Sequence, residues 1–133
     1  MIRYMLDTNI VIYTLNNRPR QVRDHFIAHD GQMCVSSVTM MELYFGAEKS
    51  SNPDRNIAEI EQFAARLDIF DYDTLAAAHT GQIRNELRCS GKNIGPYDQM
   101  IAGHARSAGL IVVTNNVSEF SRVSGLRIEN WAQ

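Results

Sequence analysis

The sequence predicts an α/β fold: one three-layer α/β/α domain with a central parallel sheet. Short β-compatible segments alternate with helical ones from residue 2 to residue 113, and this alternation is typical of right-handed βαβ crossovers. The strongest strand candidate, Leu110–Val113, is apolar throughout, as expected when both sheet faces are covered. No linker, repeat or low-complexity segment is found, so residues 1–133 are expected to form a single domain.

The first part of the chain is predicted to contain one strand and two helices. The segment Ile2–Leu6 is β-compatible and leads directly into Asp7, a residue type that often caps helices. A helix to about Leu15 is expected after it. Pro suits the first turn of a helix, so a second, amphipathic helix is predicted over Pro19–His29. Its apolar side is expected to carry Val22, Phe26 and Ile27.

The middle of the chain repeats this alternation. Residues 33–35 are predicted to form the second strand, and Ser36 and Ser37 can cap the helix that follows it. Asn52-Pro53 begins the next helix, whose apolar residues recur with a 3.6-residue period as far as Leu67. A short strand is then expected at Ile69-Phe70.

Two more helices and the last predicted strand complete the pattern. Residues 71–73 can cap a helix over 74–88, and the loop 92–96 leads to a helix over 98–108. A glycine follows each of these helices, as is common at helix ends. The strand 110–113 follows at once.

The composition is that of an ordinary globular protein, with 44% hydrophobic and 21% charged residues. Because no apolar run approaches the roughly 18 residues that span a bilayer, and no secretory signal is present, we expect a cytoplasmic protein without membrane contact. The net charge of −2 argues only weakly against a nucleic-acid partner, since bound cations would neutralise clustered acidic residues. Cys34 and Cys89 lack metal-ligand spacing and are expected to be buried or inert.

Acidic side chains are expected to meet at one edge of the sheet. In open parallel sheets the ligand site lies outside the carboxyl ends of the strands. Asp7 follows the first strand, Asp98 stands at a helix start, and Asn116 and Glu119 follow the last strong strand. Glu42 lies among apolar residues of its helix, where a buried carboxylate is costly unless it is paired or bound to metal. Each residue alone would be interpreted as a cap or a solvated charge, so the prediction depends on their convergence.

A cluster of carboxylates predicts a site for hard divalent cations. Two carboxylates about 4 Å apart repel by roughly 4 kcal/mol at an effective dielectric of 20, so several in one crevice need a proton or a cation between them. Oxygen ligands select Mg²⁺ or Mn²⁺ over zinc, and Mg²⁺ often completes its shell with substrate phosphate. Two such ions could stabilise the attacking and the leaving oxygen of a phosphodiester. The residues therefore favour a metal-dependent nuclease.

Four segments resemble the PIN-domain ribonucleases and, within them, the VapC toxins of bacterial type II toxin–antitoxin pairs. They are Met5–Asn9, Ser37–Leu43, Gly95–Ala102 and Val113–Asn116, the last followed by Glu119-Phe120, and their order and spacing are specific. The resemblance covers essentially the whole chain and implies a PIN-like fold. It also implies an endoribonuclease toxin that cuts structured RNA to block translation; very similar enteric members cut the anticodon stem-loop of initiator tRNA.

The resemblance also implies partners and site residues. It implies a cytoplasmic homodimer that a VapB-like antitoxin holds inactive by covering the acidic groove with its tail. By position, Asp7, Glu42 and Asp98 match the three acidic residues that hold metal in this family, with Mg²⁺ as the expected cofactor and Mn²⁺ as an alternative. Asn9 and Thr114 match polar residues that order the site.

The fourth acidic position of the family differs in this chain. Many PIN domains have Asp where this chain has Asn116. Either Glu119, three residues further on, supplies the charge, or the second metal site is weak. We take Glu119 as the fourth catalytic and metal-binding carboxylate and Asn116 as a residue that orders the site.

Two other functional classes are compatible with some of these residues. A metal-dependent phosphatase of the haloacid-dehalogenase kind would use Asp7 as its nucleophile, but it needs a second Asp where this chain has Asn9. A non-catalytic RNA- or protein-binding α/β module would not need its carboxylates. Since all of Asp7, Glu42 and Asp98 are present although their burial is costly, the sequence favours an enzyme.

Overall fold

A computed structural model describes residues 1–16 and 18–132, and within them five strands form one parallel sheet of order β3-β2-β1-β4-β5. The strands are β1 (Tyr4–Leu6), β2 (Met33–Ser36), β3 (Asp68–Phe70), β4 (Ile111–Val113) and β5 (Ile128–Glu129). The helices of the same residues are α1 (Thr8–Leu15), α2 (Arg20–Ala28), α3 (Ser37–Glu48), α4 (Pro53–Ala64), α5 (Thr74–Ser90), α6 (Pro96–Ala108) and α7 (Val117–Phe120). Among these described helices, none is both long and apolar enough to cross a membrane.

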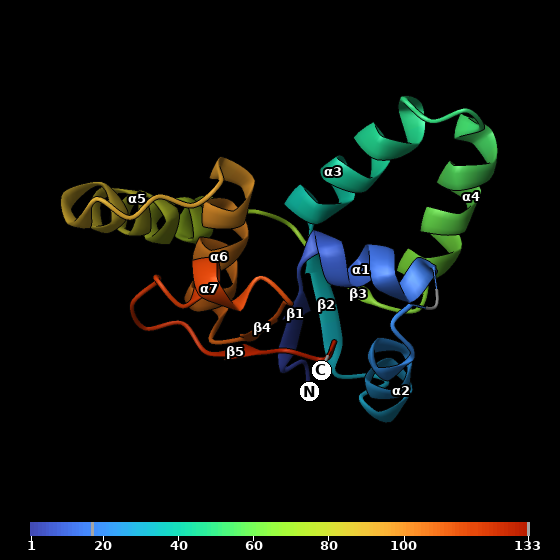
Figure 1. Cartoon of the computed structure of the whole chain (residues 1–133), viewed down its shortest axis with the longest axis horizontal. Helices are drawn as coiled ribbons and strands as arrows, with labels where there is room; N and C mark the ends of the chain where they lie inside the picture. Colours follow the sequence, from blue (N-terminus) through green and yellow to red (C-terminus); the bar gives the residue numbers. More distant parts are fainter. Residues whose placement is uncertain (17, 133) are drawn as a thin grey trace.

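Helices cover both faces of the sheet, as Figure 1 shows, with α5 and α6 on one side and α1 to α4 on the other. Alternate residues of the central strand, β1, point into the two separate apolar layers. Tyr4 and Leu6 of β1 join the apolar cluster beneath α1 to α4, whereas Met5 between them joins the cluster beneath α5 and α6. Val112 and Val113 of β4 divide in the same way. The α/β/α fold with a parallel sheet is therefore confirmed, and both faces of the sheet are buried.

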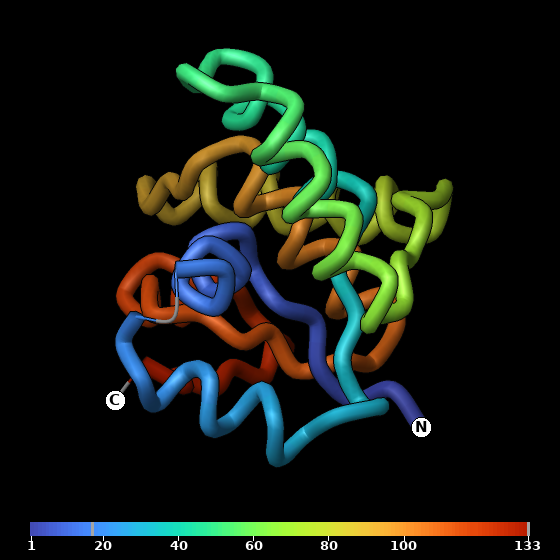
Figure 2. Tube along the Cα trace, turned by 90° about the vertical axis from the view of Figure 1, so that its right-hand side faces the viewer, coloured from blue at the N-terminus to red at the C-terminus, as the bar shows by residue number. Residues whose placement is uncertain are grey.

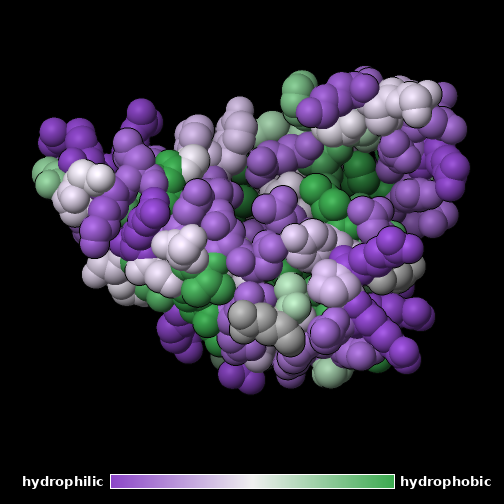
Figure 3. Space-filling model, in the orientation of Figure 1, coloured by the Kyte–Doolittle hydropathy of each residue, from purple (hydrophilic) through white to green (hydrophobic). Residues whose placement is uncertain are grey.

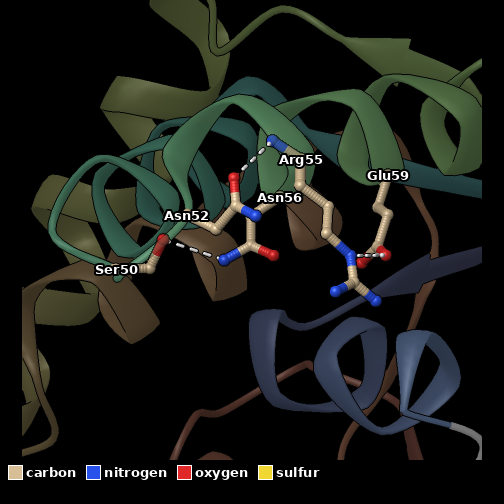
Figure 4. A network of polar contacts seen from close by, with 5 residues as sticks. All are labelled: Ser50, Asn52, Arg55, Asn56 and Glu59. Carbon is tan, nitrogen blue, oxygen red and sulfur yellow. Dashed lines mark hydrogen bonds and ion pairs between the residues drawn. The ribbon is translucent and has the colours of Figure 1, made fainter.

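The α3–α4 hairpin projects beyond the rest of the molecule in both views (Figures 1 and 2). Its turn is held by short polar contacts, which Figure 4 draws: Asn52 caps α4 by accepting from the N–H of Arg55 at 3.4 Å, and Asn56 donates to Oγ of Ser50 at 2.8 Å. The ion pair between Arg55 and Glu59 is exposed and contributes little to stability. These contacts fix the reversal of the chain, so α3 can present its outer face beside the groove described below.

Three details of the sequence prediction are wrong. The prediction missed β5 and α7, because a two-residue edge strand and a single helical turn carry no detectable periodicity. The last long helix begins at Pro96 rather than at residue 98. Ile27 was assigned to the apolar side of α2 but is 60% exposed, since the buried stripe follows Val22 and Phe26 at a spacing of four and leaves the next residue at its edge.

The C-terminal segment is anchored by Trp131, which is 1% exposed. Its ring stacks on His29 at 4.7 Å and on His25 at 5.3 Å between centroids. This anchor holds β5 against β4, and the N–H of Thr114, directly after β4, donates to the carbonyl of Glu129 at 3.0 Å. The C-terminal segment therefore holds Thr114, the residue directly after β4, in place.

Candidate active site

Asp7 lies where β1 ends and α1 begins, and it is 2% exposed. Its Oδ1 accepts from the N–H of Ile10 at 2.9 Å, the expected capping bond. Its Oδ2 accepts from Oγ1 of Thr114 at 2.6 Å, a length typical of a charge-assisted bond. The carboxylate is therefore fixed from both sides at the carboxyl end of the sheet, where the sequence predicted it.

Thr114 and Asn116 connect Asp7 to Glu119. Thr114 is fully buried, and its Oγ1 accepts from the N–H of Asn116 at 2.9 Å while donating to Asp7. The side-chain amide of Asn116 in turn donates to Oε2 of Glu119 at 2.9 Å. A continuous chain of hydrogen bonds thus runs from Glu119, on the single turn of α7, to the buried Asp7.

Glu42 lies on α3 and is half-buried. Its neighbours Met41, Tyr44 and Phe45 are exposed, Phe45 by 63%. These side chains face a groove instead of the core. Thr8, at the start of α1, donates to Oε1 of Glu42 at 2.6 Å. No pattern in the sequence pointed to Thr8, because its partner is 34 positions away.

Asp98 stands in the first turn of α6 and is half-buried. The N-cap of this helix is Gly95, which has no side chain, so capping does not explain the presence of Asp98. A carboxylate in a first helical turn is favoured by the helix dipole. The side chain is therefore stabilised where it stands without being used as a cap.

A single groove of about 890 Å³ brings together Asp7, Glu42 and Asp98. Asn9 is exposed and also lines it, whereas Glu119 lies outside its lining with Thr114 and Asn116. The remaining wall carries two charged side chains, Glu48 and Lys49, and five large, mainly apolar ones, which are Ile12, Met41, Tyr44, Phe45 and Tyr97. The groove thus combines a carboxylate cluster with an exposed apolar surface.

Burial and mutual repulsion raise the pKa values of two of these carboxylates. Burial raises the pKa of Asp7 to about 6, with smaller contributions from the charges of Asp98 and Glu42, although its hydrogen bonds from Thr114 and Ile10 act in the opposite direction. Burial also raises the pKa of Asp98 to about 6, and the charges of Glu42 and Glu119 add to this shift. Repulsion therefore links all four carboxylates, and a divalent cation would relieve it.

The donor set fits a hydrated Mg²⁺ ion. All candidate ligands are oxygens, and Cys34 is buried with a pKa raised by burial to about 12, while Cys89 is exposed. Within residues 1–16 and 18–132, no three acidic, His or Cys side chains lie close enough to enclose one ion by themselves. Mg²⁺ does not need such a cage, because it keeps several waters and binds through one or two carboxylates and substrate phosphate.

Glu119→Gln is expected to weaken activity more than Asn116→Ala does. The glutamine keeps an acceptor for the amide of Asn116 but deletes the charge that acts on Asp98, whereas the alanine deletes the hydrogen bond and keeps the charge. The check is the rate of RNA cleavage across a Mg²⁺ titration, where Glu119→Gln should need more Mg²⁺. If Glu119→Gln cleaves RNA at the wild-type rate at every Mg²⁺ concentration, Glu119 is an ordinary surface residue without a role in metal binding.

Comparisons with known proteins agree with the fold. The model of the PIN domain family matches residues 4–126. A relative from Shigella flexneri, named tRNA(fMet)-specific endonuclease VapC, is 61% identical over 99% of this chain and all of its own length. A chain of the crystal structure of DNA-bound VapBC from Salmonella typhimurium superposes with a TM-score of 0.94 at 57% identity, covering 98% of this chain and 99% of that one. A chain of VapBC2 from Rickettsia felis, whose structure was solved with a promoter DNA fragment, superposes with a TM-score of 0.92. It is 35% identical in sequence, and the match covers 98% of this chain and 99% of that one.

Proposed function

The chain belongs to the PIN-domain family and, within it, to the VapC ribonucleases, and we propose that it is the Mg²⁺-dependent toxin of a type II toxin–antitoxin pair. Residues 1–133 act as one nuclease domain in this proposal. The observation that carries it is the groove in which Asp7, Glu42 and Asp98 meet with raised pKa values for both aspartates. A cluster of this kind requires a cation and offers it only oxygen ligands.

The proposed mechanism assigns metal binding to Asp7, Glu42, Asp98 and Glu119. Bound divalent ions would polarise the scissile phosphate and supply a nucleophilic hydroxide. Asp7 is held rigidly by its two hydrogen bonds, so it fixes the centre of the site. Asp98 and Glu42 line the same groove as Asp7, and the charge of Glu119 acts on Asp98. Thr114, Asn116 and Asn9 order the site around them.

The substrate that we propose is tRNA, with the anticodon loop of initiator tRNA as the specific target. The support for initiator tRNA is the name of the Shigella flexneri relative, tRNA(fMet)-specific endonuclease VapC, which is 61% identical to this chain over nearly all of it. The anticodon loop is proposed from the resemblance to the enteric VapC toxins. A formal charge of −2 does not oppose this substrate, since cations bound at the acidic groove would reverse the local charge.

The proposed partner is a VapB-like antitoxin, whose tail covers the groove. The related structures from Salmonella typhimurium and Rickettsia felis are VapBC complexes. In this chain the acidic groove continues, past the shared Ile12 and Glu42, into a hollow between α1, α3 and α4, where Figure 3 shows hydrophobic side chains at the surface. Such an apolar path beside the site suits a peptide. We further propose a cytoplasmic homodimer.

Cleavage is expected to stop in excess EDTA and to return with Mg²⁺ or Mn²⁺, because the proposed ligands are carboxylates. The protein, freed of any partner, is incubated with initiator tRNA, with an elongator tRNA and with p-nitrophenyl phosphate. The expected result is metal-dependent cleavage in the anticodon loop of the initiator tRNA and not of the elongator tRNA. Undiminished cleavage in EDTA would contradict the metal mechanism. Hydrolysis of the phenyl phosphate alone would favour a phosphatase, and RNA binding without cleavage a binding module.

A further inference from the structure

We propose that Thr8 is a positioning residue that holds Glu42 in the orientation needed for metal binding. This inference rests on the proposed function. Thr8 is the first residue of α1 and is half-buried. Its Oγ1 lies 2.6 Å from Oε1 of Glu42, the length of a bond from a hydroxyl to an ionised carboxylate. Because Thr8 directly follows Asp7, it links the segment that carries the buried Asp7 to the half-buried Glu42 on α3.

The direction of this hydrogen bond is set by Glu42, because an ionised carboxylate can only accept. Thr39 lies one turn before Glu42 on α3, is fully buried, and has its Oγ1 3.4 Å from Oγ1 of Thr8. A hydroxyl has only one proton, and the short contact with Glu42 takes that of Thr8. The 3.4 Å contact with Thr39 is therefore a weak second contact of Thr8, and any hydrogen bond between the two hydroxyls is donated by Thr39. The hydroxyl of Thr8 engages Oε1 of Glu42 and leaves Oε2 available to a cation.

The same arrangement occurs at Asp7. Thr114 accepts from the N–H of Asn116 and donates to Asp7 at 2.6 Å, as Thr8 donates to Glu42. Glu42 has more need of such a partner, since its side chain has more rotatable bonds than that of Asp7 and is only half-buried. Loss of a group that orients a metal ligand commonly costs about 10–100-fold in metal affinity or activity.

Thr8→Val tests the proposal, because it removes the hydroxyl and keeps the branched shape. Thr14→Val is the matched control: Thr14 is on the same helix, but its hydroxyl donates to the carbonyl of Ile10 and not to a carboxylate. Thr8→Ser keeps the hydroxyl and should rescue the function. Mn²⁺ affinity is measured by calorimetry on the metal-free protein, and the Mg²⁺ dependence of RNA cleavage is measured beside it.

We expect Thr8→Val to weaken Mn²⁺ binding by about 10-fold or more and to raise the half-saturating Mg²⁺ concentration by a similar factor. Thr8→Ser and Thr14→Val should stay within about threefold of the wild type. If Thr8→Val does not fold, Thr8→Ala is compared with Thr8→Ser, since that pair differs only in the hydroxyl. Wild-type Mn²⁺ affinity in the variant without the hydroxyl would overturn the role of Thr8. It would leave the proposed function standing, because that function fails on a different result, namely a wild type that does not bind metal or does not cut RNA.

Discussion

Asp98→Asn is expected to lower RNA cleavage by orders of magnitude while leaving the fold intact. The amide keeps the shape of the side chain but removes the charge that a divalent cation requires. The N-cap of α6 is Gly95, so the substitution disturbs no capping bond. Removal of a carboxylate that repels Glu42 and Glu119 should hold or raise the thermal stability of the metal-free protein. Melting curves and cleavage rates are measured side by side.

Asp54→Asn is the control for this prediction. Asp54 also stands in the first turn of a helix, α4, but it is exposed and lies outside the groove. The same chemical change should there leave cleavage at the wild-type rate. Near-normal cleavage by Asp98→Asn would remove Asp98 from the proposed site.

Asp7→Asn is expected to abolish cleavage and, in metal-free protein at pH 7.5, to raise the melting temperature. The pKa of Asp7 is about 6 in the folded chain and 3.8 in the reference state. Between these values the folded state binds more protons than the unfolded state, so stability falls as pH rises through this window. Above pH 6, the buried ionised carboxylate lowers the free energy of unfolding by on the order of 3 kcal/mol. Asparagine carries no charge and avoids this loss. A gain of about 5 °C or more follows.

The pH dependence distinguishes this cause from a general gain in stability. Metal-free wild type should melt at a higher temperature at pH 5 than at pH 7.5, and Asp7→Asn should reduce that difference. Saturating Mg²⁺ should stabilise the wild type at pH 7.5 and the variant much less. Asp73→Asn is the control, because Asp73 makes the same capping bond, to Ala76, at an exposed position. A less stable Asp7→Asn variant at pH 7.5 would contradict the burial cost assigned to Asp7.

Much of the fold could be predicted from the sequence because its elements are marked by strong local patterns. The apolar run before Thr114 and the 3.6-residue period after Pro53 each indicate one structure. The short strand β5 could not be found in this way. It is held in place by Trp131, whose stacking on His25 and His29 is a contact between opposite ends of the chain. No local pattern reports such a contact.

The candidate site was predictable in its acidic residues and less so in their surroundings. Asp7 and Asp98 follow from the rule that ligands bind at the carboxyl ends of parallel strands. The apolar neighbours of Glu42 divide between two environments: Met41, Tyr44 and Phe45 line the groove, whereas Met40 and Leu43 pack in the core. The sequence could not show this division, because it depends on how α3 packs. Thr8 was missed because a hydrogen bond across 34 positions depends on how α1 packs against α3.

The central claim is that the carboxylates of this groove hold divalent cations, and anomalous scattering from crystals soaked in Mn²⁺ tests it most directly. The account predicts a manganese peak in the groove, about 2.1 Å from carboxylate oxygens of Asp7 and Asp98, with waters completing the shell. The peak should be absent from crystals of Asp98→Asn soaked under the same conditions. A groove without manganese at saturating concentrations, or a peak that persists unchanged in Asp98→Asn, would contradict the account.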